Sequence, residues 1–350
     1  MAAFVALTAL YYGILLFIFA GRFRAAQNKV LNENTVLSRE HTDAIKGIAA
    51  MGIVISHIAA YIKYGVQGFP RYYVVLGTTL GGIGVNLFFF ASGFGNYYSA
   101  KRIKSLRMQT SWLIRRVLSI LNIFIICFVL TSIFLQIEGY SQSLGEMVRG
   151  VLRLRMPLTI TWYVKVQILL YVILTVSLFF EYKIQSILLI GFSFISSYSL
   201  YKLGYAEEWW KSTLCFALGY YVAMHKTDIV RVINRRNHLW FYGSLAAFPL
   251  LFIMACLIDN YWIKVLGNTL LVADMLIIAE FFEPGNHLFE KIGTFSLEIY
   301  LIHISLCGWF LQDRIPDSIG ICKIVIWTVA IAILAKMIDD KIAARIRKIN

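Results

Sequence analysis

The sequence predicts an all-α integral membrane protein, a single bundle of about eleven transmembrane helices. Hydrophobic residues make up 59% of the 350 residues and charged residues only 15%, whereas a soluble domain carries roughly 25% charged residues. Apolar runs of about the length that crosses the hydrocarbon core recur from one end of the chain to the other. This composition excludes a soluble globular enzyme.

Hydrophobic runs predict the individual spans. Residues 1–40 form an extra N-terminal helix with a cytoplasmic linker, and residues 41–350 form the polytopic domain, in which ten helices follow one another. The predicted spans are 2–20, 44–62, 74–98, 112–135, 158–180, 184–200, 209–224, 239–258, 262–281, 294–311 and 320–338.

The basic residues predict the orientation. The formal net charge is +14, which by itself would suggest a nucleic-acid partner. Lys and Arg gather instead in alternate loops, as the positive-inside rule requires, so we expect no nucleic-acid partner. The chain is expected in the cell membrane, with the N-terminus outside and the C-terminus in the cytoplasm. The largest inward clusters are Arg22, Arg24, Lys29 and Arg39, then Lys101, Arg102, Lys104 and Arg107, and finally Lys341, Arg345, Arg347 and Lys348.

The five cysteines predict neither disulfides nor a metal site, because they have no paired spacing and each lies in an apolar run. Ionisable groups at membrane depth are more informative, since they are costly there. His57 lies eleven residues beyond Lys46, about 16 Å along a helix. His303 is also placed near mid-bilayer, and two histidines at similar depth suggest one shared polar cavity. The alternative for His57 is a structural hydrogen bond to a neighbouring helix.

Further polar residues lie on other predicted spans. Lys165 enters from the outer side, and Asp274 is the carboxylate expected to face it, as a buried ion pair with or without a functional role. Glu298 lies nearer the cytoplasm. Arg115 and Arg116 lie at a cytoplasmic helix end, where guanidinium groups could bind phosphates. The alternative for these arginines is contact with lipid headgroups.

Four segments together resemble one family, the integral membrane acyltransferases of family three, which include bacterial O-acetyltransferases of surface polysaccharides. Asp43 and Lys46, with His57 after ten intervening residues, resemble the family's D-x-x-R-G-x-A segment and its histidine. Residues Phe89–Phe94, which include Ser92, are similar to the family's F-x-x-S-G-F segment, and Trp162–Tyr171 to its W-F…Y segment. Residues Ser296–His303 are similar to its S-x-x-x-Y-L-x-H segment.

Two positions depart from the family pattern. Lys46 stands where the family usually has Arg, and Lys lacks the bidentate fork. Ser119 follows Arg116 where the family tends to carry a second Arg of R-x-x-R.

The resemblance implies transfer of an acyl group, usually acetyl, from cytoplasmic acetyl-CoA or another acyl-CoA to a hydroxyl of an extracytoplasmic glycan or lipid-linked saccharide. No permanently bound cofactor is implied. His57 is the expected general base, because its ordinary pKa suits removal of a hydroxyl proton. Lys46, Arg115 and Arg116 are expected to bind the donor. Asp43, Ser92, Trp162, Lys165, Asp274, Glu298 and His303 are expected to support the site or contact the acceptor.

Two other functional classes fit the composition. A transporter or flippase of a lipid-linked sugar or small anion would also have midplane charges, but the chain lacks paired half-sequences. A scaffold subunit of a glycan-assembly complex would need its buried charges only for folding. Direct transfer and transfer through a covalent intermediate, for example on Ser56, both remain open, and the sequence predicts no particular oligomeric state.

Overall fold

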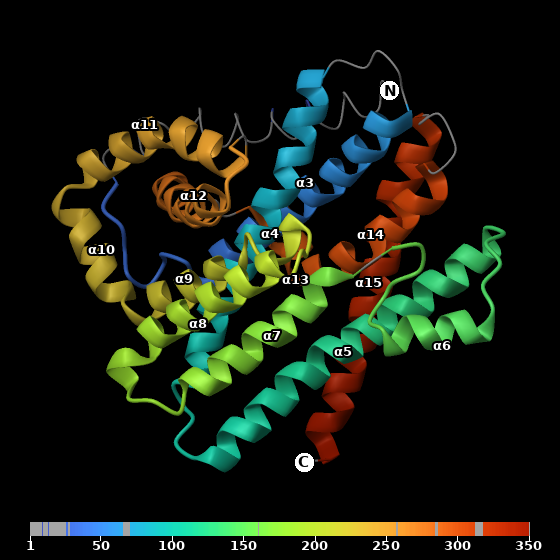
Figure 1. The fold of residues 1–350 in the computed structure, drawn as a ribbon, viewed down its shortest axis with the longest axis horizontal. Coiled ribbons are helices and arrows are strands. Elements are labelled where there is room, and N and C mark those ends of the chain that lie inside the picture. The colour runs from blue at the N-terminus through green and yellow to red at the C-terminus, as the bar shows by residue number, and fades with distance from the viewer. Residues whose placement is uncertain are drawn as a thin grey trace.

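A computed structural model shows a helical bundle and contains no β-strand in the part of the chain that it describes (Figure 1). It describes residues 29–65, 71–159, 161–256, 258–283, 286–311 and 318–349, together with residues 9, 13 and 26. The predicted span 2–20 falls outside these ranges, apart from residues 9 and 13. The all-α membrane class predicted from the sequence is confirmed.

Each of the other ten predicted spans coincides with one helix. These helices are α3 (Arg39–Gly65), α4 (Arg71–Ala100), α5 (Leu106–Ile137), α7 (Trp162–Ser177), α8 (Tyr182–Lys202), α9 (Thr213–Met224), α11 (Asn237–Cys256), α12 (Tyr261–Phe282), α14 (Ser296–Leu311) and α15 (Ser318–Ile349). The connections hold four short helices that the sequence did not predict, α6 (Leu144–Leu152), η1 (Glu207–Trp209), α10 (Lys226–Arg235) and α13 (His287–Thr294).

Not every helix is long enough to cross a bilayer alone. In the described ranges, six helices have the length and composition of a membrane span, and α13 with α14 adds a seventh if this pair, bent by 74°, counts as one. Helices α7 and α9 have 16 and 12 residues, and crossing the hydrocarbon core takes about 20. The sequence predicted these helices but not how far each reaches across the membrane.

Glycines bring the central helices into backbone contact. A Cβ atom on Gly93 of α4 would lie 1.9 Å from the Phe216 carbonyl oxygen, and one on Gly219 of α9 would lie 2.1 Å from the Phe90 oxygen. The same relation holds between α3 and α13, where a Cβ atom on Gly293 would lie 1.8 Å from the Asp43 oxygen. Small residues permit such approaches between membrane helices. Helix α3 is therefore held tightly at the end where it begins.

The contact between α3 and α4 continues toward the other end of α3. A Cβ atom on Gly84 would lie 2.8 Å from the Ala49 carbonyl oxygen, and one on Gly81 would lie 2.4 Å from Ser56 Oγ. Helix α14 also packs against α3, where His303 contacts His57. These contacts surround His57, so its position depends on small residues of α4.

Polar contacts hold the segment before α3 against the bundle. Asn234 of α10 exchanges two hydrogen bonds with the backbone of Leu31, each 2.8 Å long. At the end of α12, the carboxylate of Glu280 accepts the backbone N–H of Leu37 at 2.9 Å and contacts His41 Nδ1 at 3.0 Å. Residues 29–38 are therefore attached to the ends of two helices that come far later in the sequence.

Helices α5 and α7 run side by side, and α6 lies at the far edge of the molecule from α10 and α11 (Figure 1). Ser143 and Glu146 cap α6 reciprocally. Its apolar residues Leu144, Val148 and Leu152 are four apart and between 51% and 78% exposed. This spacing forms an apolar stripe typical of a helix at a membrane interface.

The glycine contacts predict a specific sensitivity. Substitution Gly219→Ala forces α4 and α9 apart, because the new methyl group overlaps the Phe90 carbonyl. We expect a loss of about 1–3 kcal/mol, the usual cost of overpacking, measured as a lower thermal unfolding midpoint of the purified protein in detergent. Gly191→Ala in α8 is the matched control, since nothing lies within 4 Å of its Cβ position. Equal midpoints for the two variants would contradict this packing argument.

Candidate functional site

His57 and His303 form a hydrogen-bonded pair between α3 and α14. The distance from His303 Nε2 to His57 Nδ1 is 3.0 Å. His303 Nδ1 lies 2.8 Å from the Ile299 carbonyl oxygen, and His57 Nδ1 lies 3.0 Å from the Ile53 oxygen. The structure thus joins the two histidines that the sequence placed at similar depth.

These contacts assign the tautomer of each neutral ring. A carbonyl oxygen only accepts, so Nδ1 of His303 and Nδ1 of His57 each carry their ring's hydrogen. His303 Nε2 then accepts the His57 Nδ1–H, which is shared with the Ile53 oxygen. His57 Nε2 is left without a hydrogen, as a base requires. His303 is fully buried and is placed to orient His57.

His57 lines a cavity of about 710 Å³, called here the His57 cavity. Its wall is formed by α3, α4, α14, the start of α7 with the segment before it, and the segment between α8 and α9. Ser56 and Trp162 line it, and so does Trp209, which the sequence analysis did not select. The cavity combines a candidate base with indole surfaces that could bind a ligand ring.

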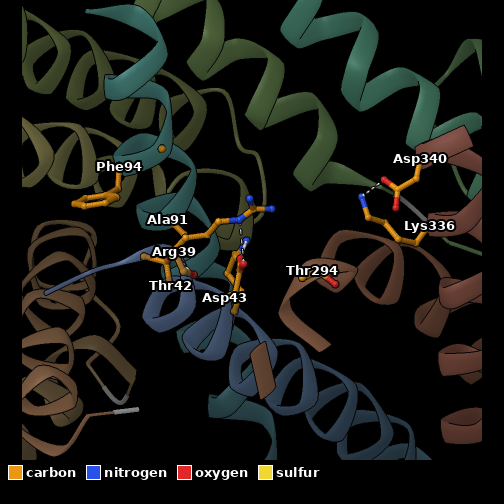
Figure 2. Close-up of a pocket in the computed structure, with 10 residues that line it drawn as sticks. Arg39, Thr42, Asp43, Ala91, Phe94, Thr294, Lys336 and Asp340 are labelled. Atoms are coloured by element: carbon orange, nitrogen blue, oxygen red, sulfur yellow. Dashed lines mark hydrogen bonds and ion pairs between the residues drawn. The ribbon is translucent and has the colours of Figure 1, made fainter. Parts of the chain in front are cut away.

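Lys46 lies at the other end of α3, beside cavities of about 540 and 270 Å³. Its ammonium group pairs with Asp43 at 2.6 Å, and Arg39 contacts the same carboxylate at 3.7 Å. Figure 2 shows Arg39 and Asp43 on one side of the larger cavity, and Lys336 and Asp340 of α15 on the other. Lys336, which the sequence analysis did not select, lines both cavities.

Arg116 connects this region to a further cavity of about 460 Å³, because it lines both that cavity and the one of 270 Å³. Its Nη2 donates to Ser99 Oγ at 2.7 Å, and its guanidinium lies 5.7 Å from the Trp112 ring centre. Of these three cavities, Arg115 lines only the one of 460 Å³. Shared residues therefore link three adjoining cavities, called here the cationic cavities, which open where α3 and α5 begin.

Two more of the predicted residues lie in the smallest cationic cavity. Ser92 Oγ accepts a hydrogen bond from Gln167 Nε2 at 2.8 Å, and both residues line this cavity. Glu298 lines it as well, although only 3% of the residue is exposed. Ser92 and Glu298 thus face the same space as Lys46 and Arg116.

Three aromatic rings separate this space from the His57 cavity. Phe88 and Tyr163 line the smallest cationic cavity, and Tyr300 lines the His57 cavity. The Tyr163 and Tyr300 ring centres lie 4.9 Å apart, and Phe88 lies 6.3 and 6.4 Å from them. No described residue lines both cavities. The three rings, called here the aromatic septum, lie between the two cavities.

The predicted pairing of Lys165 with Asp274 is wrong. Lys165 Nζ lies 5.8 Å from the Trp209 ring centre. Asp274 shares a hydrogen bond with Ser244 of α11, and its Oδ2 is buried without a hydrogen-bond partner in the described structure. Depth along a helix had suggested the pair, but the two side chains point to different neighbours. Asp274 therefore lies apart from both sets of cavities.

The described residues contain no group of three or more His, Cys, Asp or Glu side chains placed to hold a metal ion. Sequence reasoning also missed Arg155 and Lys211, which line the His57 cavity. Both come from connecting segments, where a basic residue is ordinary. Only the fold brings them beside α3.

Comparison with known proteins identifies the class. A family model described as an acyltransferase domain, that of acyltransferase family 3, matches residues 41–337. The chain belongs to this family and is a membrane acyltransferase. Neither a curated protein nor a solved structure matches it.

Proposed function

We propose that this protein transfers an acetyl group from acetyl-CoA, bound in the cationic cavities, to a hydroxyl of a glycan or lipid-linked saccharide in the His57 cavity. One observation carries the proposal. His57, whose Nε2 carries no hydrogen, lines a cavity that the aromatic septum separates from a second, cation-lined space. Two ligands that enter from opposite faces of a membrane can meet where two such cavities adjoin.

The donor end suits a phosphorylated ligand. Lys46, Arg115, Arg116 and Lys336 line the cationic cavities, and their positive charge complements the phosphates of a CoA. Asp43 holds the Lys46 ammonium in place. The acyl-bearing arm of the donor would extend toward the septum, because the thioester has to reach His57.

The chemistry assigned to His57 is general base catalysis. His57 Nε2 takes the proton of the acceptor hydroxyl while the hydroxyl oxygen attacks the thioester carbonyl carbon. The new C–O ester bond forms, the C–S bond breaks, and the leaving thiolate takes the proton back from the imidazolium. His303 accepts the His57 Nδ1–H throughout and so keeps Nε2 directed at the acceptor.

The orientation follows from the loop charges. We propose that the face where α3 and α5 begin is cytoplasmic, that the N-terminus is outside and that the C-terminus is cytoplasmic. This direction brings a cytosolic CoA to the cationic cavities and an extracytoplasmic saccharide to His57.

The histidine pair is tested with purified variants. His57→Ala should lower acetyl transfer per folded molecule by about 10² to 10⁴, the usual effect of removing a general base. His303→Ala should lower turnover less, and His303→Gln should recover part of that loss because its amide oxygen can accept the His57 Nδ1–H. Turnover by His57→Ala above about a tenth of wild type would refute the assignment.

The donor site is tested through Arg116. Arg116→Ala should raise the KM for acetyl-CoA about 10-fold to 100-fold, since a lost charged hydrogen bond costs about 1.5–3 kcal/mol. Arg107→Ala is the control, because Arg107 is exposed at the start of the same helix and lines none of the cavities described. The same KM in both variants would contradict donor binding by Arg116 and would indicate that its contacts to Ser99 and Trp112 are structural.

The orientation is tested by labelling. Single cysteines at Ser141 and Arg236, both exposed, are placed on a background without native cysteines. In intact cells an impermeant maleimide should label the Ser141→Cys variant, and it should label Arg236→Cys only after permeabilisation. The reverse pattern would show the opposite orientation.

A further inference from the structure

Two cations line the His57 cavity, and a third contacts one of its lining residues. Arg155 and Lys211 line it, and Lys165 lies over the ring of Trp209, which also lines it. The Lys211 ammonium lies against α4, 3.5 Å from the Cβ position of Gly82. The cations come from the loop before α7, from α7 itself and from the segment before α9. No motif of the acyltransferase resemblance includes Arg155 or Lys211.

Lys211 already has a counter-ion. Its ammonium contacts Glu207 at 2.7 Å, and Glu207 also pairs with Lys264. Burial alone would raise the pKa of Glu207, but the two ammonium groups lower it to about 2, so the carboxylate stays charged. Lys264 in turn contacts the exposed Asp259 at 2.9 Å.

Arg155 and Lys165 have no acidic partner in the part of the chain that the structure describes. Arg155 is exposed, and its Nε donates to the Thr159 carbonyl oxygen at 3.0 Å. No described residue accepts from the four N–H groups on its two Nη atoms. Lys165 is half-buried, and among the described residues its ammonium contacts the Trp209 ring. Glu208 also lines the cavity, and within the described ranges it forms no ion pair with either cation.

The backbone around Arg155 is strained. Leu154 and Leu158, on either side of it, have φ angles of 48° and 61°, in the left-handed region that bulky residues avoid. Such conformations persist where the surrounding structure fixes them, often beside a ligand. Here they set the turn in which Arg155 Nε bonds to Thr159 and the guanidinium faces the cavity.

The charges around the cavity do not balance. Arg155, Lys165 and Lys211 carry three positive charges, against which stand Glu207 and Glu208. One positive charge is therefore in excess beside the cavity. Arg155 is exposed, but Lys165 is half-buried without an acidic partner among the described residues, and such a charge is unfavourable. An anionic group on the ligand would offset it, and a guanidinium with free Nη atoms binds a carboxylate with two hydrogen bonds.

We propose that the acceptor is an acidic sugar, a saccharide ring that carries a carboxylate. This inference rests on the proposed function. The ring lies against the indoles of Trp162 and Trp209, its carboxylate contacts Arg155 with Lys165 nearby, and its reacting hydroxyl lies at His57 Nε2. One end of the sugar ring is thus recognised by its charge, and the other end presents the hydroxyl that reacts.

Binding of two matched probes tests the proposal. Methyl β-D-glucuronide and methyl β-D-glucoside share one ring and differ in the carboxylate. By calorimetric titration of the purified full chain, the glucuronide should bind at least 10-fold more tightly, about 1.4 kcal/mol. Equal affinities on the wild-type protein would overturn the proposal.

Variants locate the effect. Arg155→Gln should reduce the ratio of the two affinities to near one, whereas Arg153→Gln, exposed on the same segment and outside the cavity, should leave it unchanged. Lys165→Met is the second variant if Arg155→Gln does not fold, and it should reduce the ratio in the same direction. An unchanged ratio in a folded variant of either residue would refute the assigned contact.

Transfer assays separate this inference from the proposed function. Equal acetyl transfer to both glycosides would leave the acyl transfer from acetyl-CoA intact and reject the acidic acceptor. Arg155-dependent glucuronide binding with no acetyl transfer to either probe would instead support the acidic-sugar site and count against the proposed reaction.

Discussion

Contact between helix backbones is the constraint on which the rest of this structure depends. Apolar side chains gain little by leaving lipid for one another, so helices in a membrane associate through close packing and polar contacts. Here the packing is at its closest at Gly93 and Gly219 between α4 and α9, and at Gly47 and Gly293 between α3 and α13. Helix α3 lies between these crossings and carries Lys46 and His57 about 16 Å apart on one rigid element.

The polar groups of the site depend on that frame. His57 and His303 are joined by one hydrogen bond, which weakens steeply with distance and angle. The pair therefore keeps its geometry only if α3 and α14 do not slide past each other. The same holds for the Lys46 ammonium, which Asp43 positions from one turn earlier on α3. The side-chain geometry at both ends of the proposed reaction path therefore depends on glycines that take no part in the chemistry.

The sequence alone predicted the class, the ten described apolar helices and the common depth of His57 and His303. These features follow from composition and from distance along a helix. The direction in which each side chain points around the helix axis was not predicted, as the wrong Lys165–Asp274 pair shows. Two residues at one depth can face opposite sides, and which side each faces depends on packing that one sequence does not encode locally. Lys336 and Arg155 were missed for the same reason, since only the assembled bundle brings them to the cavities.

The aromatic septum has a consequence for the membrane as an electrical insulator. Water-filled cavities conduct ions far better than hydrocarbon, so any voltage across the bilayer falls mainly across whatever low-dielectric layer separates them. In this protein that layer is reduced locally to the rings of Phe88, Tyr163 and Tyr300. In the proposed orientation, much of the transmembrane field falls across these rings, and they keep the two cavities from forming a leak.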